Sequence, residues 1–540
     1  MSAVRVGGAL LALAVLGCQD GSPRSLGTSC GMFEGRAEVG GAGVAEGLAT
    51  YSKRVITPQG PTGAVTPTPI RYADVELISC QTGAVLASGQ TDGDGRFQIT
   101  FNNPGRVGVY LRVLSSVDRY RVSVQRSAAE PFLYGLASSA YDDAGDGEIQ
   151  SVQGLEARSG LGAGAFNILD QGVRGAEVVE NLTGAAPVSP LVWFWFPGNS
   201  SGTSYDPSAK AITVLGTTAD PDEFDDAVLL HEYGHYVLDV YSRDDSPGGP
   251  HVLGDETLDL RLAWSEGWAT FFSSVVRNDP VHVDTSGTGV RLVFEIEGPS
   301  FGTATRYDTN ELAVAAVLWD AHDADDADEG AGSLSGLLPA VWGVVSGLAT
   351  SPVSFEDFWI AWQSANPGDL QPILEARSID LWADDQEAGG NDDDPSRAKP
   401  IELFVGNNPT AVQHHSLYPG GDIDYVAFTA PAVGTFTVAT SRCTGFPVVC
   451  DARVSNAADT VLDVLSLSDD GTAADNLNGQ TYSLSCALAS CPPNDATTLS
   501  SSVTFTATMG TPYIIRITRS PDAPPSAGEL GTYDLLVTSE

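Results

Sequence analysis

Lysine is scarce in this chain, and basic residues as a whole are few. Only Lys53, Lys210 and Lys399 are lysines, and 27 lysines and arginines stand against 69 aspartates and glutamates, which gives a formal net charge of -42 over 540 residues. Such a surface repels phosphate backbones and anionic headgroups, so DNA, RNA and anionic membranes are disfavoured as partners. Acidity of this degree instead favours solubility outside the cell.

Long apolar runs are also missing. The stretch Val6–Leu16 follows one positive charge in Met1–Arg5 and is too short to cross a bilayer as a helix, which is typical of a signal peptide. It ends in Val15-Leu16-Gly17-Cys18, which resembles a bacterial lipobox and implies lipidation of the Cys18 thiol. Because Leu16 is unusual before that glycine, secretion without an anchor is the alternative. We therefore predict a signal peptide with lipobox at residues 1–18 of an exported protein, either a bacterial outer-membrane or cell-surface lipoprotein or a secreted one.

Cysteines number seven, and six remain once Cys18 is set aside. An even number in an exported chain favours disulfides, which persist outside the cytoplasm. Local spacing predicts the pairs Cys443–Cys450 and Cys486–Cys491, which leaves Cys30 and Cys80 as the N-terminal pair, and mixed pairings stay open. None of the six lies near the histidine motif described next, which disfavours a thiolate metal site.

The string His231-Glu232-Tyr233-Gly234-His235 is the most informative feature present. Two imidazoles four residues apart lie on one face of a helix, where both can reach a single zinc while Glu232 stays unligated. The flanks predict that helix, with Asp222 as its N-cap and apolar residues recurring after it. The spacing is typical of a zinc hydrolase, and a chance pentapeptide on a buried helix is the alternative.

A zinc hydrolase needs a third protein ligand and leaves the fourth position to water. The metzincin pattern would place a glycine and a histidine where Leu238 and Tyr241 stand, so that class is excluded. Downstream, Glu266 is the one carboxylate in the apolar, helix-compatible segment 262–272. Because an unpaired buried carboxylate is costly, Glu266 needs a cation, and zinc is the candidate.

His231–His235 followed by Ser265-Glu266-Gly267-Trp268-Ala269 resembles the gluzincin metalloproteases, the clan of thermolysin and fungalysin. The segment Asn310–Asp320, ending in Leu-Trp-Asp, also resembles fungalysin, and the likeness covers about residues 160 to 385. It implies that His231, His235 and Glu266 bind Zn²⁺. Glu232 would be the general base that takes a proton from the attacking water and passes it to the leaving amine.

The resemblance has departures around the third ligand. Ser265 and Thr270 stand where thermolysin has the Asn and Asp that orient the metal ligands, so Asp239 or a backbone carbonyl is the alternative orienting group. Glu311 is a further candidate for a side chain that faces the cleft.

A donor beyond the metal should stabilise the tetrahedral intermediate, and His251, Tyr307 and His322 are the candidates. The spacing predicts that His322 shares a helix face with Glu311. A surface or cap role for each of these residues is equally supported.

Two strand patterns, Leu191–Phe196 and Ala211–Leu215, precede the zinc helix. In zincins an edge strand beside the active-site helix pairs with extended substrate, and Ala211–Leu215 is the candidate for it.

Calcium is a candidate cofactor at the acidic run from Asp320 to Glu329, although solvated loop charge is the favoured interpretation.

Residues 30–135 are predicted to be β and resemble a carboxypeptidase-regulatory-like or transthyretin-like sandwich. Alternating strands are expected at Ile70–Ile78 and Arg96–Phe101. Between them Asp92-Gly93-Asp94-Gly95 is a second candidate calcium site, and a hairpin turn explains it without a metal.

The polar segment 389–395 predicts a linker, after which short strands recur between Gly, Pro and Asp turns. Residues 396–540 resemble the bacterial pre-peptidase C-terminal domain. That likeness implies secretion, substrate attachment or removal during maturation, and the sequence leaves these three roles open.

A chain of this length exceeds one core. The predicted fold is multidomain: an α+β zincin-like catalytic domain at 155–388 flanked by the N-terminal β-sandwich and a jelly-roll-like C-terminal β-sandwich. The predicted function is an exported zinc-dependent metalloendopeptidase acting on protein or peptide substrates. One alternative is a zinc aminopeptidase, which needs an amine-binding acidic or aromatic motif ahead of the zinc helix. The other is a surface adhesin with an inactive zincin fold.

Overall fold

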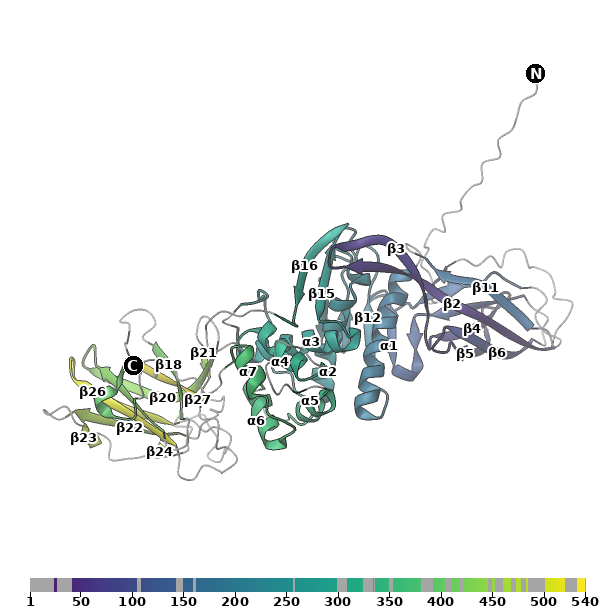
Figure 1. Ribbon diagram of the computed structural model, residues 1–540. Coiled ribbons are helices and arrows are strands. Elements are labelled where there is room, and N and C mark those ends of the chain that lie inside the picture. Colours follow the sequence, from purple (N-terminus) through teal and green to yellow (C-terminus); the bar gives the residue numbers. More distant parts are fainter. Residues whose placement is uncertain are drawn as a thin grey trace, which may run out of the picture. The chain divides into compact units, whose positions relative to one another are not determined.

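A computed structural model of the chain divides into two compact units (Figure 1). Unit 1 comprises Met1–Val240 and Phe272–Glu295, and unit 2 comprises Tyr241–Phe271 and Ile296–Glu540. The structure describes residues 24–26, 41–103, 108–141, 149–158, 162–255, 258–298, 308–323, 334, 336–348, 353–379, 392–401, 403, 410–417, 422–444, 449–451, 460–467, 473–476, 482–483, 501–519 and 532–539. The predicted signal peptide and Cys18 lie outside these residues.

Two sheets form the N-terminal part of unit 1. One has the strand order β1-β10-β7-β4-β5, and the other has the order β11-β2-β3 with β6 also paired to β2. Burial alternates along β6, where Phe97, Ile99 and Phe101 face the core, and Ile99 packs directly against Gly89 of β5. The bounds are β1 Arg24–Leu26, β2 Gly41–Thr57, β3 Gly60–Pro69, β4 Asp74–Ser79, β5 Val85–Gln90, β6 Arg96–Asn103, β7 Val109–Leu114, β10 Tyr134–Ala137 and β11 Ile149–Ala157.

The predicted β character of this region is therefore observed. The expected strand at Ile70–Ile78 begins later, at Asp74, because Tyr72 adopts a left-handed conformation with φ 56°. Asp92–Gly95 forms a turn in which the Asp92 carboxylate accepts hydrogen bonds from the backbone N–H groups of Asp94 and Arg96. The turn is not the hairpin turn that the sequence favoured, because β5 pairs with β4 and β6 pairs with β2 in a different sheet. Calcium binding at this run stays a prediction.

A third sheet in unit 1 carries the order β13-β14-β12-β9-β8. Its strands are β8 Ser116–Val117, β9 Val122–Gln125, β12 Leu191–Phe194, β13 Ser204–Asp206 and β14 Ala211–Thr213. The prediction that Ala211–Leu215 forms the edge strand is wrong, because β13 pairs antiparallel with β14 and covers that edge. Strand β9 pairs in parallel with β12, so this sheet joins residues from both sides of the predicted boundary at 135.

Helices α1 (Ala163–Thr183) and α2 (Asp226–Tyr241) meet at a glycine. A Cβ on Gly175 of α1 would lie 2.6 Å from the ring of Tyr233 on α2, so only glycine allows this approach. The predicted N-cap is wrong, since Asp222 begins a separate 3-10 helix, Asp222–Phe224. The α-helix starts after Asp225, whose non-helical ψ of 80° breaks the run and whose carbonyl accepts the N–H of Leu229.

Helix α3 (Leu260–Arg277) is continuous, and its last turns belong to unit 1. There Phe272 stacks on Tyr233 with ring centroids 6.0 Å apart, and Ser273 Oγ donates to the carbonyl of Ala227 at 2.8 Å. The hairpin of β15 (Val281–Ser286) and β16 (Gly289–Glu295) follows, and β3 lies beside it (Figure 1).

Unit 2 contains four further helices among its described residues: α4 Glu311–Asp320, α5 Leu338–Val345, α6 Phe355–Ala365 and α7 Gln371–Ala376. The Asn310 side chain caps α4 by accepting the N–H groups of Leu312 and Ala313. Fully buried Asp320 ends α4 in an ion pair with Arg377 at 2.5 Å. His322 therefore lies in the turn beyond the helix, and the prediction that it shares a helix face with Glu311 is wrong.

The C-terminal part of unit 2 consists of two β-sheets around one apolar core. Their orders are β17-β19-β26-β22-β23, with β24 paired to β22, and β18-β27-β20-β21, with β25 paired to β20. The predicted all-β character is confirmed. The bounds are β17 Lys399–Ile401, β18 Thr410–Ser416, β19 Ile423–Thr429, β20 Gly434–Thr444, β21 Val449–Asp451, β22 Thr460–Leu467, β23 Ala473–Asn476, β24 Tyr482–Ser483, β25 Ser502–Ala507, β26 Pro512–Arg519 and β27 Thr532–Ser539.

Among the cysteines, Cys80 is disulfide-bonded. Cys443 and Cys450 stand opposite each other in the backbone register of β20 and β21. Cys30, Cys486 and Cys491 lie outside the described residues, so the three pairings stay predictions.

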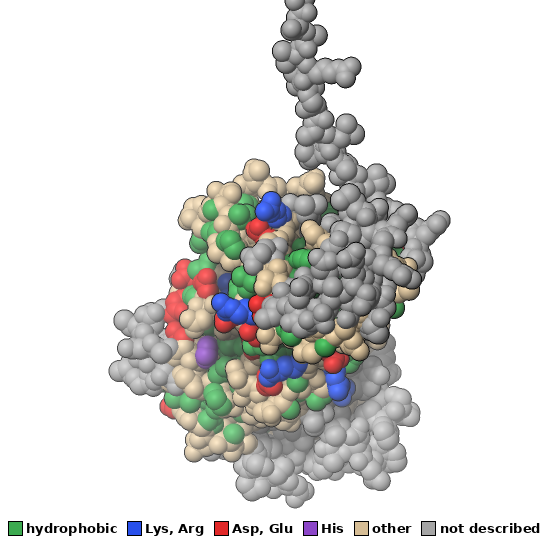
Figure 2. Space-filling view, turned by 90° about the vertical axis from the view of Figure 1, so that its right-hand side faces the viewer, with side chains coloured by type: hydrophobic (Ala, Val, Ile, Leu, Met, Phe, Trp, Pro, Cys, Tyr) green, Lys and Arg blue, Asp and Glu red, His purple; other side chains and the backbone are tan. Residues whose placement is uncertain are grey.

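The described surface mixes both signs of charge. On the face drawn in Figure 2, basic side chains lie beside acidic ones, and ion pairs such as Arg71–Glu177 and Arg112–Glu76 in unit 1 agree with this pattern. No helix within the described part of the chain combines the length and apolar character that a bilayer crossing requires.

Replacing Gly175 by Ala should destabilise the protein by about 1–3 kcal/mol, because the new Cβ overlaps Tyr233 in a packed interior. Urea unfolding of the full chain measures the change. Gly343→Ala in α5 is the matched control: no atom lies within 4 Å of its Cβ position, so better helix propensity should leave stability unchanged or raised by up to about 1 kcal/mol. Equal effects at the two glycines would contradict the packing account.

Candidate metal centre

The two motif histidines lie together on α2. His231 Nε2 and His235 Nε2 are 3.2 Å apart, and the ring planes meet at 83° with centroids 4.9 Å apart. The predicted helix and the shared face are therefore observed. Tetrahedral zinc with Zn–N bonds of 2.0–2.1 Å holds two nitrogens about 3.3 Å apart, so the separation of this pair fits such a metal.

Glu232 lies between these histidines in sequence and faces strand β13. Its Oε2 accepts a hydrogen bond of 2.8 Å from the backbone N–H of Tyr205. The edge strand of the third sheet therefore runs beside the carboxylate proposed as base. Sequence reasoning missed Tyr205, because a backbone N–H leaves no side-chain pattern to recognise.

The Asp239 side chain, one turn after His235, accepts hydrogen bonds from the Tyr205 hydroxyl and from Lys210 Nζ. Burial and the Asp239 carboxylate raise the pKa of Tyr205, so the hydroxyl stays protonated and donating. Asp239 thus joins α2 to β13 and to the end of the β13–β14 turn. Its predicted role as an orienting group for a zinc ligand stays a prediction.

His282 on β15 is a second residue that sequence reasoning missed. Its ring centroid lies 6.4 Å from that of His231, and it stacks on Phe294 of β16 at 4.6 Å. Burial first, and then the nearby His231 and Arg277, lower the pKa of His282 well below its usual value.

In unit 2, α3 presents Glu266 to two of the predicted residues. His251 Nε2 lies 3.8 Å from Glu266 Oε2 and 3.6 Å from Glu311 Oε2, so the three form one cluster. Close helix packing explains it: a Cβ on Gly267 would lie 2.6 Å from Val314 and 2.9 Å from the carbonyl of Glu311. Gly267 thereby lets α4 bring Glu311 against α3.

The remaining predicted residues are placed as follows. Ser265 is buried and its Oγ donates to Asp244 Oδ2 at 3.0 Å, and Thr270 is buried on α3. His322 packs edge-on against Phe271 and Trp319, and burial lowers its pKa. Tyr307 and the acidic positions 324–329 lie outside the described residues.

A cluster of carboxylates in unit 1 comes from the segment before α2 and from β15. Ligand oxygens of Asp220, Asp222 and Asp284 lie within 4.8 Å of one another, and each residue has a buried oxygen without a hydrogen-bond partner among the described residues. Burial chiefly, helped by neighbouring carboxylates, raises the pKa of Asp222 to about 7 and of Asp284 to about 6. Arg291 is the basic side chain paired with Asp220, at 2.8 Å.

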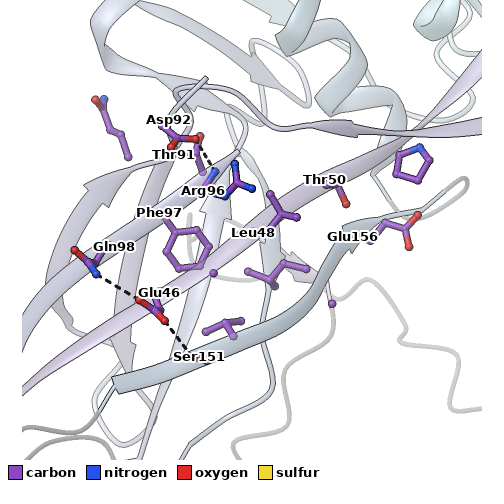
Figure 3. A pocket seen from close by; sticks show the side chains of 16 residues that line it. Glu46, Leu48, Thr50, Thr91, Asp92, Arg96, Phe97, Gln98, Ser151 and Glu156 are labelled. Carbon is purple, nitrogen blue, oxygen red and sulfur yellow. Dashed lines mark hydrogen bonds between the residues drawn. The ribbon is translucent and has the colours of Figure 1, made fainter. Parts of the chain in front are cut away.

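A cavity of about 910 Å³ opens between β2, β6 and β11 (Figure 3). Its carboxylate Glu46 accepts hydrogen bonds from Gln98 Nε2 at 3.3 Å and from Ser151 Oγ at 3.2 Å. Glu46 therefore has hydrogen-bond partners within this groove.

Residues 183–379 match the family model for the Mycolysin C-terminal domain, a domain found in peptidases. The matched region contains α2, α3 and α4, and so includes His231, His235 and Glu266. It covers less than half of the chain.

An uncharacterized protein of Archaeoglobus fulgidus is 37% identical over 131 residues, which are 23% of this chain and 34% of that protein. The chain thus spans about a third of the length of this relative.

Solved structures with detectable likeness include the pre-peptidase C-terminal domain of Bacillus anthracis collagenase, with 13% identity and a TM-score of 0.16, covering 26% of this chain and 94% of that one. The K3 adhesin domain of Lys-gingipain from Porphyromonas gingivalis matches with 15% identity and a TM-score of 0.15, covering 29% and 90%. TM-scores this low do not establish a shared fold.

The acidic cluster predicts a pH dependence of stability. Asp222, Asp284 and Asp225, whose pKa burial raises to about 8, hold protons in the folded state that they release in the unfolded state above about pH 4. The free energy of unfolding should therefore fall as pH rises from about 4 to 8 in chelator. Urea unfolding at several pH values checks this, and Asp222→Asn should flatten the fall. A variant with an unchanged slope would contradict it.

Proposed function

We propose that this chain is an exported zinc-dependent metalloendopeptidase with His231, His235 and Glu266 as protein ligands. Together these residues offer two imidazole nitrogens and one carboxylate oxygen, a set that could hold one metal ion. The observation that carries the proposal is the 3.2 Å separation of the two Nε2 atoms on α2. The match of the surrounding region to a domain found in peptidases supports it.

The continuity of α3 supports Glu266 as the third ligand. The last turns of α3 pack on α2 through Phe272 and Ser273, and Glu266 precedes Phe272 by six residues in the same helix. Six residues rise about 9 Å along a helix. Glu266 is also held in a cluster with His251 and Glu311, as a mostly buried carboxylate that needs cationic or donor partners.

Each side chain then has a defined task. Zinc bound at this site would polarise a peptide carbonyl and lower the pKa of a bound water toward about 7. Glu232 takes the proton of the attacking water and delivers it to the leaving amine. His251, beside Glu266 and partly exposed, donates a hydrogen bond to the developing oxyanion.

The edge strand β13 is the proposed substrate platform. Its pairing with β14 leaves its other edge free of a partner strand among the described residues, and Tyr205 N–H at that edge contacts Glu232. An extended peptide that adds to β13 would therefore pass the catalytic carboxylate. This geometry suits cleavage within a chain, which favours an endopeptidase.

The flanking modules and the second cofactor complete the proposal. The C-terminal β part is proposed as a pre-peptidase C-terminal domain, and Cys18 as the lipid anchor of an exported protein.

Calcium is proposed at Asp220, Asp222 and Asp284, where a hard cation would relieve mutual repulsion among carboxylates. In the urea titrations above, Ca²⁺ should then restore stability at pH 8 in the parent and not in Asp222→Asn. An equal increase in the free energy of unfolding on adding Ca²⁺ to both proteins would contradict the proposal of a calcium site here.

Glu232→Gln tests the enzyme directly. The variant should bind zinc as the parent does and lose nearly all peptide hydrolysis, because the amide cannot accept the proton of water. Metal analysis and cleavage of an unfolded protein substrate measure the two properties. Glu46→Gln, which neutralises a carboxylate in the groove of Figure 3, is the matched control and should cleave normally. A zinc-loaded parent without proteolysis on any substrate would favour the adhesin alternative.

His251→Ala should lower kcat by about 100-fold with little change in zinc content, because one oxyanion donor is removed. His322→Ala, whose ring packs on Phe271 and Trp319, is the comparison and should leave kcat near that of the parent. Steady-state kinetics on one peptide substrate distinguish the two. Unchanged kcat in His251→Ala would remove it from the proposed mechanism.

A further inference from the structure

A second cavity in unit 1, of about 470 Å³, combines aromatic walls with unmatched polar groups. We call it the aromatic pocket, and its defining residues come from four separate segments: Arg54, Phe132, Tyr134, Trp195, Glu223 and Phe224. Its size lies within the range of about 300–1,000 Å³ that is usual for small-ligand sites. No residue of the proposed metal centre lines it.

Two polar atoms in the aromatic pocket have no hydrogen-bond partner among the described residues. They are Trp195 Nε1 and Glu223 Oε2, and the two residues are only 4% and 9% exposed. Burial raises the pKa of Glu223, and the indole N–H of Trp195 is near enough to act in the opposite direction, but its geometry is not that of a hydrogen bond. An unsatisfied buried carboxylate oxygen is costly, so a donor from outside the chain would be stabilising here.

Both side chains are fixed by glycine backbone. A Cβ on Gly164 of α1 would lie 2.7 Å from Glu223 Cγ and 2.9 Å from Trp195 Cζ2, and one on Gly216 would lie 3.0 Å from Trp195 Nε1. The unmatched groups are therefore held in place before any ligand arrives. Preorganisation of this kind reduces the entropy lost on binding.

Arg54 supplies a positive charge to the aromatic pocket. The Arg54 guanidinium lies 4.6 Å above the ring of Phe224, and no described carboxylate forms an ion pair with it. Arg126, the other basic residue of the cavity, is already paired with Glu130 at 2.6 Å. Arg54 also lowers the pKa of Glu223, against the upward effect of burial.

One ligand chemistry matches this arrangement. The Glu223 carboxylate suits an ammonium or another N–H donor, the Arg54 guanidinium suits an anion, and the aromatic side chains of the cavity suit an apolar group. We propose that the aromatic pocket binds an apolar zwitterion, namely a free amino acid or short peptide, with its α-ammonium on Glu223 and its α-carboxylate on Arg54. This goes beyond the proposed catalytic function and does not depend on it.

The test uses the full chain carrying Glu232→Gln and depleted of metal, so that no hydrolysis intervenes and failure of the enzyme proposal leaves the result readable. Isothermal titration with L-phenylalanine should show saturable binding. N-acetyl-L-phenylalanine and L-phenylalanine amide should each bind about tenfold more weakly, because each loses one charge-assisted contact.

Variants assign the two contacts. Glu223→Gln should weaken the binding of L-phenylalanine about tenfold and leave the binding of N-acetyl-L-phenylalanine unchanged. Arg54→Met should likewise weaken the binding of L-phenylalanine about tenfold and leave the binding of L-phenylalanine amide unchanged. Glu46→Gln is the control and should bind as the parent chain does. If Glu223→Gln fails to fold, Arg54→Met and the two blocked ligands decide. Equal binding of all three ligands, or no saturable binding in the millimolar range, overturns the proposal.

Discussion

The packing around Tyr233 is the constraint on which the candidate site depends. This aromatic side chain, inside the motif itself, fills the space left by Gly175 on α1 and stacks on Phe272 of α3. Because Tyr233 is fully buried, the rotation of α2 about its axis is fixed, and the histidines on either side of it must face the opposite way. The same contact anchors the helix that carries Glu266. A core interaction thus sets the direction in which the polar residues project.

Polar contacts then refine what packing allows. Tyr205 contributes twice, with its backbone N–H on Glu232 and its hydroxyl on Asp239, so a short edge strand is tied to α2 at two points. In unit 2, Gly267 lets α4 approach and brings Glu311 and His251 to Glu266. Asp320 and Arg377 close the other end of α4 as a buried pair, which favours one arrangement of that helix because either charge alone would be costly there.

The sequence predicted the elements whose signals are local. The i, i+4 histidine spacing predicted α2, and alternation predicted β6 and the C-terminal strands. The start of α2 could not be predicted, because Asp225 breaks the helix through a tertiary contact in which Thr285 donates to its carboxylate. The edge strand was missed because β13 has three residues and its pairing with β14 is visible only in the sheet. Glu223 and Phe224, an acidic and an aromatic residue ahead of α2, become notable only once the fold surrounds them with Trp195 and Arg54.

The most direct measurement of the central claim is X-ray absorption at the zinc edge on the full chain loaded with one equivalent of zinc. The account predicts a first shell of two imidazoles with nitrogen and oxygen neighbours at about 2.0–2.1 Å and no sulfur. Loss of one low-atomic-number ligand in Glu266→Ala, with both imidazoles retained, would match the proposed ligand set. A shell with a single imidazole, or one that is unchanged in Glu266→Ala, would contradict it.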